Sequence, residues 1–199
     1  IENIPAINKK AMWANKWIND KTSSFGTRLI AFAVLEGIFF SGAFCAIFWI
    51  KEKNILSGLC KSNEFISRDE GMHRDFAILL YNQLKKRNDY ILGCNNKIII
   101  NIVKEAVEIE KEFISSSFNC RLIGMNSDEM KKYIEFVADN LLLNLDIHKI
   151  YNTNNPFLFM ENIGLQNKTN FFENRVTEYA KANSTADNED TKLSFHDNF

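Results

Sequence analysis

The chain has 199 residues, which is enough for one domain or for a domain with a tail. A hydrophobic fraction of 46% and an aromatic fraction of 13% exclude a wholly disordered chain. The 24 lysines and arginines balance the 25 aspartates and glutamates, so the charge gives no reason to expect a nucleic-acid partner. Glycine (8) and proline (2) are scarce, which favours long helices. Because the first residue is Ile1 and not methionine, we expect a processed or incomplete chain.

The four cysteines lie at least 15 residues apart, so the sequence contains no CxxC metal-binding motif. A chain with this much apolar material for a core has little need of a disulfide framework. The first ten residues, IENIPAINKK, lack the apolar stretch of a signal peptide. These features predict an intracellular, cytoplasmic protein.

The first two predicted helices lie in the N-terminal quarter of the chain. Residues 6–20 carry apolar side chains on one face and predict a short amphipathic helix. Ser23 or Ser24 can cap the next helix, which we expect to continue to about Lys53.

This second helix contains a long apolar run at residues 29–50, 22 residues with one charge, Glu36. Its length is sufficient to cross a membrane. A helix at the centre of a soluble bundle is also apolar on all sides, and from this run alone the two interpretations are about equal. In either case a carboxylate in an apolar helix needs a partner, a hydrogen bond or a metal.

Three further helices follow, each with apolar residues at helical spacing. They are expected from Ser62 or Asn63 to about Lys86, from about Lys97 to Phe118, and from a cap at Asn126 to about Leu145. Residues 54–61 are expected to connect the second helix to the third around Gly58. Glu129 lies three residues after Asn126, as in a capping box. The chain becomes polar near its end, so we expect a helical domain at 1–172 and a flexible tail at 173–199.

These elements predict an all-α fold, a helical bundle with a flexible tail. No strand pattern of any length occurs in the sequence. The amphipathic helices around the apolar run offer it surfaces to bury against, which favours a core helix over a membrane span.

The most informative short motif is Glu70-x-x-His73, which places a carboxylate and an imidazole on one face of a helix. Alone, this motif is common by chance, and a solvated Glu beside a His would explain it. Glu36 changes the interpretation. Ferritin-like bundles build a dinuclear site from two helices that each donate a Glu and two that each donate Glu-x-x-His. This chain carries half of that set in the expected order, and iron suits such ligands.

Residues near these ligands fit the same interpretation. Asp69 precedes Glu70 and could hydrogen-bond the second ring nitrogen of a metal-bound His73, or could be a plain surface charge. Phe40 and Phe44 follow Glu36 at helical spacing, and Ile66 lies one turn before Glu70. They would place an apolar wall beside the metals, although ordinary core packing explains them equally well.

Longer strings give the sequence a family resemblance. VLEGIFFSGAFCAIFW (34–49), SNEFISRDEGMHRDFA (62–77), KKYIEFVADNLL (131–142) and KTNFFENRVTEY (168–179) resemble the small, radical-bearing subunit of class I ribonucleotide reductase of the eukaryotic type. The similarity covers nearly the whole chain in order, and it is far more specific than any single motif.

The resemblance implies a ferritin-like bundle whose di-iron centre uses oxygen to make a tyrosyl radical. It implies that the radical is passed to a large subunit that reduces ribonucleoside diphosphates to deoxyribonucleotides. By position, Glu36, Glu70 and His73 match iron ligands. The resemblance also matches Asp69, Arg68 and Tyr179 to the radical-transfer path, and Phe40, Phe44 and Ile66 to the apolar pocket around the radical.

The last residues, LSFHDNF (193–199), resemble the peptide through which the family docks on the large subunit. Apolar anchors are kept at Leu193, Phe195 and Phe199. His196 and Asn198 stand where the family often has acidic residues, which bears on partner preference. The resemblance further implies pairing with a second small subunit, as a homodimer or a heterodimer.

The sequence lacks one ligand carboxylate, a second Glu-x-x-His, the radical tyrosine and the interior tryptophan of the family pattern. We therefore expect the chain to be the C-terminal part of a longer protein, unable to complete a di-iron site alone. Two rival hypotheses remain at this stage. The chain could be a non-catalytic docking module or atypical paralogue that binds the large subunit, or a single-pass membrane protein.

Overall fold

The computed structural model describes residues 4–87, 92–117 and 124–160, and in this part of the chain all regular elements are helices. The six helices are α1 (Pro5–Asn19), α2 (Phe25–Ile38), α3 (Ser41–Glu52), α4 (Ser57–Lys86), α5 (Asn96–Ser117) and α6 (Ser127–Asn144). The all-α prediction is confirmed. The predicted tail at 173–199 and the domain boundary at 172 lie outside the described residues.

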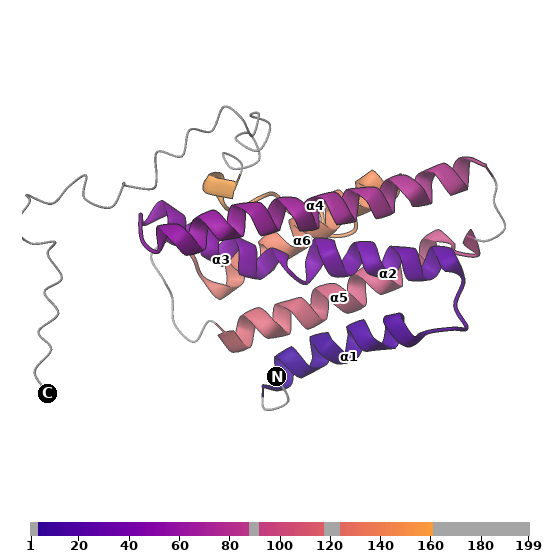
Figure 1. The fold of residues 1–199 in the computed structure, drawn as a ribbon, viewed down its shortest axis with the longest axis horizontal. Helices are drawn as coiled ribbons and strands as arrows, with labels where there is room; N and C mark the ends of the chain where they lie inside the picture. The colour runs from indigo at the N-terminus through magenta and orange to yellow at the C-terminus, as the bar shows by residue number, and fades with distance from the viewer. Residues whose placement is uncertain (1–3, 88–91, 118–123, 161–199) are drawn as a thin grey trace, which may run out of the picture.

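Helix α2 lies at the centre of the bundle (Figure 1), where it packs against α1, α4, α5 and α6. The chain runs through α2 and α3 in one direction and returns along both of them as the long helix α4. Ile30, Val34 and Ile38 recur every four residues along α2 and are fully buried. They belong to one core with buried residues of α5 and α6, among them Val103, Val107, Ile134 and Leu142.

Two of the predicted helix caps are present. Ser24 Oγ accepts a hydrogen bond from the Thr27 backbone N–H at 3.2 Å, and α2 follows. Asn126 Oδ1 accepts one from the Glu129 backbone N–H at 2.9 Å, at the start of α6. Glu129 reaches back and accepts from Asn126 Nδ2 at 2.9 Å. Both caps were predictable because each depends on residues three positions apart.

The apolar run forms two helices, and the prediction of one continuous second helix is wrong. Helix α2 ends at Ile38 and α3 begins at Ser41. Ser41 Oγ donates a hydrogen bond to the Ile38 carbonyl at 2.6 Å, which stabilises the break. Gly42 lies just beyond it, and a Cβ there would meet Glu110 Oε1 at 2.7 Å. The bundle thus needs a glycine here for the close approach of α3 to α5.

The connection between α3 and α4 is shorter than predicted. Helix α4 begins at Ser57, so Gly58 lies inside the helix and not in a loop. Asn54 and Leu56 adopt positive φ values of 55° and 53°, which turn the chain within a few residues. The Leu56 carbonyl then accepts from the Cys60 backbone N–H at 3.0 Å, starting the helix. Non-glycine residues with positive φ are uncommon, so the sequence did not predict a turn this short.

Phe25–Glu52 is long and apolar enough to cross a membrane by length and composition alone, and its most apolar 18-residue window has a mean hydropathy of 2.1. In the bundle, 56% of its most apolar window is buried. This burial supports the interpretation of α2 and α3 as core helices.

A buried carboxylate, Asp139 of α6, holds the segment that follows the helix. It is fully buried and accepts hydrogen bonds from the backbone N–H groups of Ile150 (2.9 Å), Tyr151 (3.1 Å) and Asn152 (2.7 Å). Asn152 has a positive φ of 56°. Three charge-assisted bonds to one side chain fix this segment against the bundle.

A second buried carboxylate, Glu110 of α5, forms an ion pair with Lys10 of α1 at 2.7 Å. The Glu110 side chain is fully buried, and that of Lys10 is 18% exposed. Burial raises the pKa of Glu110, and the charge of Lys10 opposes this effect. Lys10 Nζ also donates to the Phe39 carbonyl at the end of α2 and lies 4.2 Å from the centre of the Phe113 ring. One lysine therefore joins α1, α5 and the break after α2.

We predict that Lys10→Met lowers the free energy of unfolding by about 3 kcal/mol, because it leaves a buried carboxylate without its counter-charge. Lys9→Met is the matched control, since Lys9 pairs with Glu112 at the surface and the two side chains are 52% and 49% exposed. It should cost less than about 1 kcal/mol. Urea unfolding measures both changes. Equal losses for the two variants would show that the buried pair has no special structural role.

Candidate metal centre

The three carboxylate and imidazole groups singled out in the sequence lie together at the packing of α2 on α4. Glu36 extends from the last turn of α2, and Glu70 and His73 extend from adjacent turns of α4. One potential ligand atom from each lies within 4.8 Å of those of the other two. Glu36 and Glu70 are partly buried, and His73 is exposed. Such distances allow all three side chains to reach one cation.

Electrostatic coupling links the three groups. Burial, followed by the neighbouring Glu70, raises the pKa of Glu36 to about 7. The pKa of Glu70 is lowered, first by a hydrogen bond from Glu36 and also by His73. His73 Nδ1 lies 2.8 Å from Glu70 Oε2, and this contact raises the pKa of His73. The two carboxylates repel each other unless a positive charge lies between them. A proton can supply that charge, and a bound cation can take its place.

The geometry fits a divalent metal. Glu36 Oε2 is buried, and within the described residues it has no hydrogen-bond partner. A buried carboxylate oxygen in this state is costly, and a metal bond would satisfy it. Two carboxylates with one imidazole suit iron or manganese and leave coordination positions open. The three side chains therefore form a candidate ligand group for a metal ion.

The aromatic neighbours expected beside the ligands do not form a closed pocket in the described residues. Phe40 and Phe44 have ring centres 5.9 Å apart, but the helix break lies between Glu36 and both of them. Phe40 is 37% exposed and Ile66 is 47% exposed. The break places both phenylalanines outside the helix that contains Glu36, but Phe44 lines the same cavity as Glu36 and Glu70. Their predicted role around a radical stays a prediction.

The remaining predicted site residues are placed as follows. Asp69 is exposed, and its charge contributes to the raised pKa of His73. The hydrogen bond of His73 Nδ1 is with Glu70 and not with Asp69. Arg68 lines a cavity beside the ligands. Tyr179, Leu193, Phe195 and Phe199 lie outside the described residues.

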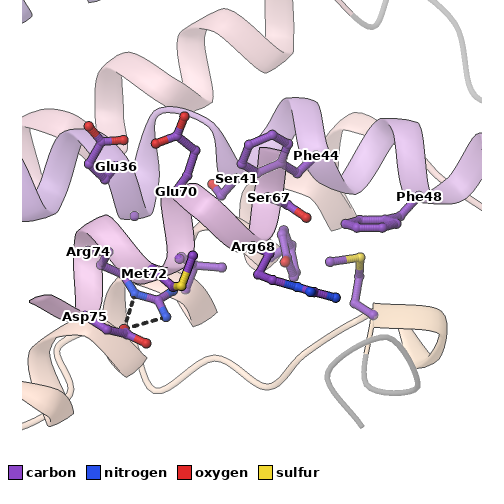
Figure 2. Close-up of a pocket in the computed structure, with 15 residues that line it drawn as sticks. Glu36, Ser41, Phe44, Phe48, Ser67, Arg68, Glu70, Met72, Arg74 and Asp75 are labelled. Carbon is purple, nitrogen blue, oxygen red and sulfur yellow. Dashed lines mark hydrogen bonds and ion pairs between the residues drawn. The ribbon is translucent and has the colours of Figure 1, made fainter. Parts of the chain in front are cut away.

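This cavity, of about 610 Å³, lies between α3, α4 and α6 and is bordered by Glu36 and Glu70 (Figure 2). Figure 2 shows both carboxylates directed away from the ion pair of Arg74 with Asp75, whose nitrogen and oxygen lie 2.7 Å apart. Ser41, Ser67 and Tyr133 also line the cavity. The sequence analysis missed these residues, because they come from three helices and share no local motif.

Fold and site together define a class: an all-α bundle protein with a candidate metal-binding cluster of two carboxylates and one histidine on two packed helices. Residues 1–156 match the family described as "Ribonucleotide reductase, small chain". The chain belongs to this family, and the resemblance drawn from the sequence is confirmed. Its fold is accordingly the ferritin-like helical fold.

Relatives extend the match over most of the chain. The ribonucleoside-diphosphate reductase small chain of Neurospora crassa is 56% identical over 182 residues, which is 92% of this chain and 43% of the relative. The small chain of Yaba-like disease virus is 51% identical over 199 residues, 100% of this chain and 59% of the relative. The chain thus spans about half the length of the curated relatives it matches.

A solved structure supports the fold. The ribonucleotide reductase Rnr4 homodimer from Saccharomyces cerevisiae superimposes with a TM-score of 0.70 at 39% sequence identity. The match covers 83% of this chain and 52% of the yeast chain.

We predict that Glu36→Gln weakens Fe(II) binding at least about tenfold, because the amide lacks the negative charge and has one oxygen where the carboxylate has two. Equilibrium dialysis under anaerobic conditions measures the affinity. Glu105→Gln is the control, since Glu105 lies on α5 in an exposed pair with Lys16. Equal affinities for the two variants would contradict the assignment of Glu36 as a ligand.

Proposed function

We propose that the chain works as a small subunit of ribonucleoside-diphosphate reductase, contributing metal ligands and a docking tail to the enzyme that makes deoxyribonucleotides. The observation that carries this proposal is the cluster of Glu36, Glu70 and His73 within 4.8 Å in a chain of this family. The metal in this proposal is iron, one of the two metals that suit the ligands, as part of a di-iron centre. When bound, it supplies the oxygen chemistry by which a side chain is oxidised to a radical.

In this proposal the residues of the chain have distinct tasks. Glu36, Glu70 and His73 hold the metal, and Asp69 would hydrogen-bond the second ring nitrogen of the metal-bound His73. Phe40, Phe44 and Ile66 exclude water from the metal centre once another part of the protein covers their exposed sides. Asp69, Arg68 and Tyr179 belong to the path by which the radical leaves for the large subunit.

The proposed partners are a large subunit and a second small subunit. The tail anchors Leu193, Phe195 and Phe199 would bind the large subunit, since a short peptide with apolar anchors can fill pockets on a protein surface. The balanced charge of the chain is compatible with a protein partner and lacks the excess of basic residues that is typical of nucleic-acid binding. We place the protein in the cytoplasm, where the described cysteines, which are free, would stay reduced.

We predict that deleting residues 193–199 abolishes binding to the large subunit. The substitution Phe199→Ala should weaken binding at least about tenfold, because it removes an aromatic anchor. Asn198→Ala is the neighbouring control and should change the affinity less than about threefold. Surface plasmon resonance with immobilised large subunit measures all three. Unchanged binding after the deletion would reject the docking role of the tail.

We predict separately that Tyr179→Phe leaves Fe(II) binding and docking intact but abolishes turnover by the assembled reductase, because phenylalanine lacks the hydroxyl needed to pass an electron and a proton. The readouts are anaerobic Fe(II) dialysis, surface plasmon resonance and reduction of a ribonucleoside diphosphate. Turnover retained by Tyr179→Phe would remove Tyr179 from the path. If docking persisted in a chain that bound no metal, the docking-module alternative would replace the enzymatic one.

A further inference from the structure

The break between α2 and α3 creates two helix ends inside the bundle, and neither helix carries the charge that its own end favours. The last turn of α2 contains no basic residue, and the first turn of α3 contains no acidic residue. A helix dipole favours a cation at the C-terminal end of a helix and an anion at the N-terminal end. Charges that complement these two ends must therefore come from other helices.

The ion pair of Lys10 and Glu110 lies at these two ends. Lys10 of α1 donates a hydrogen bond to the Phe39 carbonyl, at the C-terminal end of α2. Glu110 of α5 lies against the first turn of α3, where a Cβ on Gly42 would be 2.7 Å from Glu110 Oε1. One buried ion pair thus brings a cation to the end of α2 and an anion to the start of α3.

The same face of α1 also holds the side chain of Phe39. The Trp13 ring packs edge-to-face on the Phe39 ring with centres 4.8 Å apart, and both residues are 3% exposed. Lys10 and Trp13 are three residues apart on α1, so one helix face contacts both the carbonyl and the ring of Phe39. The end of α2 is therefore fixed by a helix that carries none of the three candidate metal ligands.

Glu36 lies in the helical turn that ends at Phe39. The Phe39 backbone N–H donates to the Leu35 carbonyl at 3.2 Å, and this bond closes the turn that contains Glu36. The helix dipole disfavours a carboxylate in the last turn of a helix, so this turn depends on support from its neighbours. Within the described residues, no hydrogen bond holds Glu36 Oε2. The position of this carboxylate therefore depends on how firmly the end of α2 is held.

We propose that Lys10 is a positioning residue for the metal cluster, and that it acts on Glu36 through the end of α2. With the last turn of α2 fixed by Lys10, the Glu36 carboxylate stays within reach of the two ligands on α4. The inference rests on the proposed function for the metal-binding role of Glu36. It goes beyond that function because it assigns the ligand geometry to an ion pair between α1 and α5, outside the two helices that carry the ligands.

The experiment uses the protein at its full natural length and a double variant, Lys10→Met with Glu110→Leu. Removing both charges leaves no unpaired carboxylate in the core, so this variant should fold with nearly unchanged stability. It still lacks the donor for the Phe39 carbonyl. We expect crystal structures without metal to show the Glu36 carboxylate displaced from Glu70 by about 1 Å or more. Anaerobic equilibrium dialysis should show Fe(II) affinity reduced at least about tenfold.

Two further variants separate positioning from stability. Ile99→Ala removes a fully buried side chain about 16 Å along α5 from Glu110, so it should lower stability and change Fe(II) affinity less than about threefold. Lys10→Arg keeps a cation and hydrogen-bond donors at the break, so it should bind Fe(II) more tightly than Lys10→Met. Urea unfolding measures the stability of each variant.

Three results would overturn the inference. A double variant that kept Glu36 in place and bound Fe(II) as tightly as the unmodified protein would remove the positioning role of Lys10. An equal loss of affinity in Ile99→Ala would assign the effect to stability alone. Both results would leave the proposed function intact. An unmodified protein that bound no Fe(II) would reject the metal-binding role of the proposed function and the inference with it.

Discussion

The ion pair between Lys10 and Glu110 is the interaction on which the arrangement of the first five helices depends. It lies where α1 packs against α5, and the same ammonium group donates a hydrogen bond to the carbonyl of Phe39 where α2 ends. A carbonyl released by a helix break is costly in a core unless a donor reaches it. Lys10 provides that donor, so the break can lie inside the bundle. The close fit of Gly42 against Glu110 then sets the position of α3.

The ligand cluster follows from this arrangement. Glu36 lies three residues before Phe39, in the last turn of α2. The point at which α2 ends therefore sets the position of Glu36 along the bundle axis. Gly37, the next residue, allows α4 to approach closely, because a Cβ there would lie 3.0 Å from the Arg74 side chain. Arg74 directly follows His73, so this approach places the imidazole beside the Glu36 carboxylate. A break and a glycine thus bring together residues that are far apart in the sequence.

Local signals in the sequence were sufficient for much of the fold. Helical spacing predicted the helices, and the caps at Ser24 and Asn126 depend only on nearby residues. The spacing of Glu70 and His73, together with the isolated charge of Glu36, was enough to group three side chains that the structure brings within reach of one cation.

Features that depend on contacts between distant segments were not predictable in this way. The break at Phe39 depends on Lys10, and the buried positions of Glu110 and Asp139 depend on partners far along the chain. In the sequence, both carboxylates look like ordinary surface charges of amphipathic helices. The exposure of Ile66 and Phe76 was also not predictable. Helical periodicity shows that a helix has an apolar face, but it does not show whether another element covers that face. The roles given to the tail stay predictions.

The aromatic cluster at the helix break has an optical consequence. Trp13 of α1 is 3% exposed, and its ring lies 4.8 Å from that of Phe39 and 5.9 Å from that of Trp17, both in edge-to-face geometry. Asymmetric, fixed contacts between aromatic rings give rise to near-ultraviolet circular dichroism, which disappears when tertiary packing loosens. The indole pair on α1 is therefore an intrinsic spectroscopic reporter of whether this helix is docked, and it needs no added label.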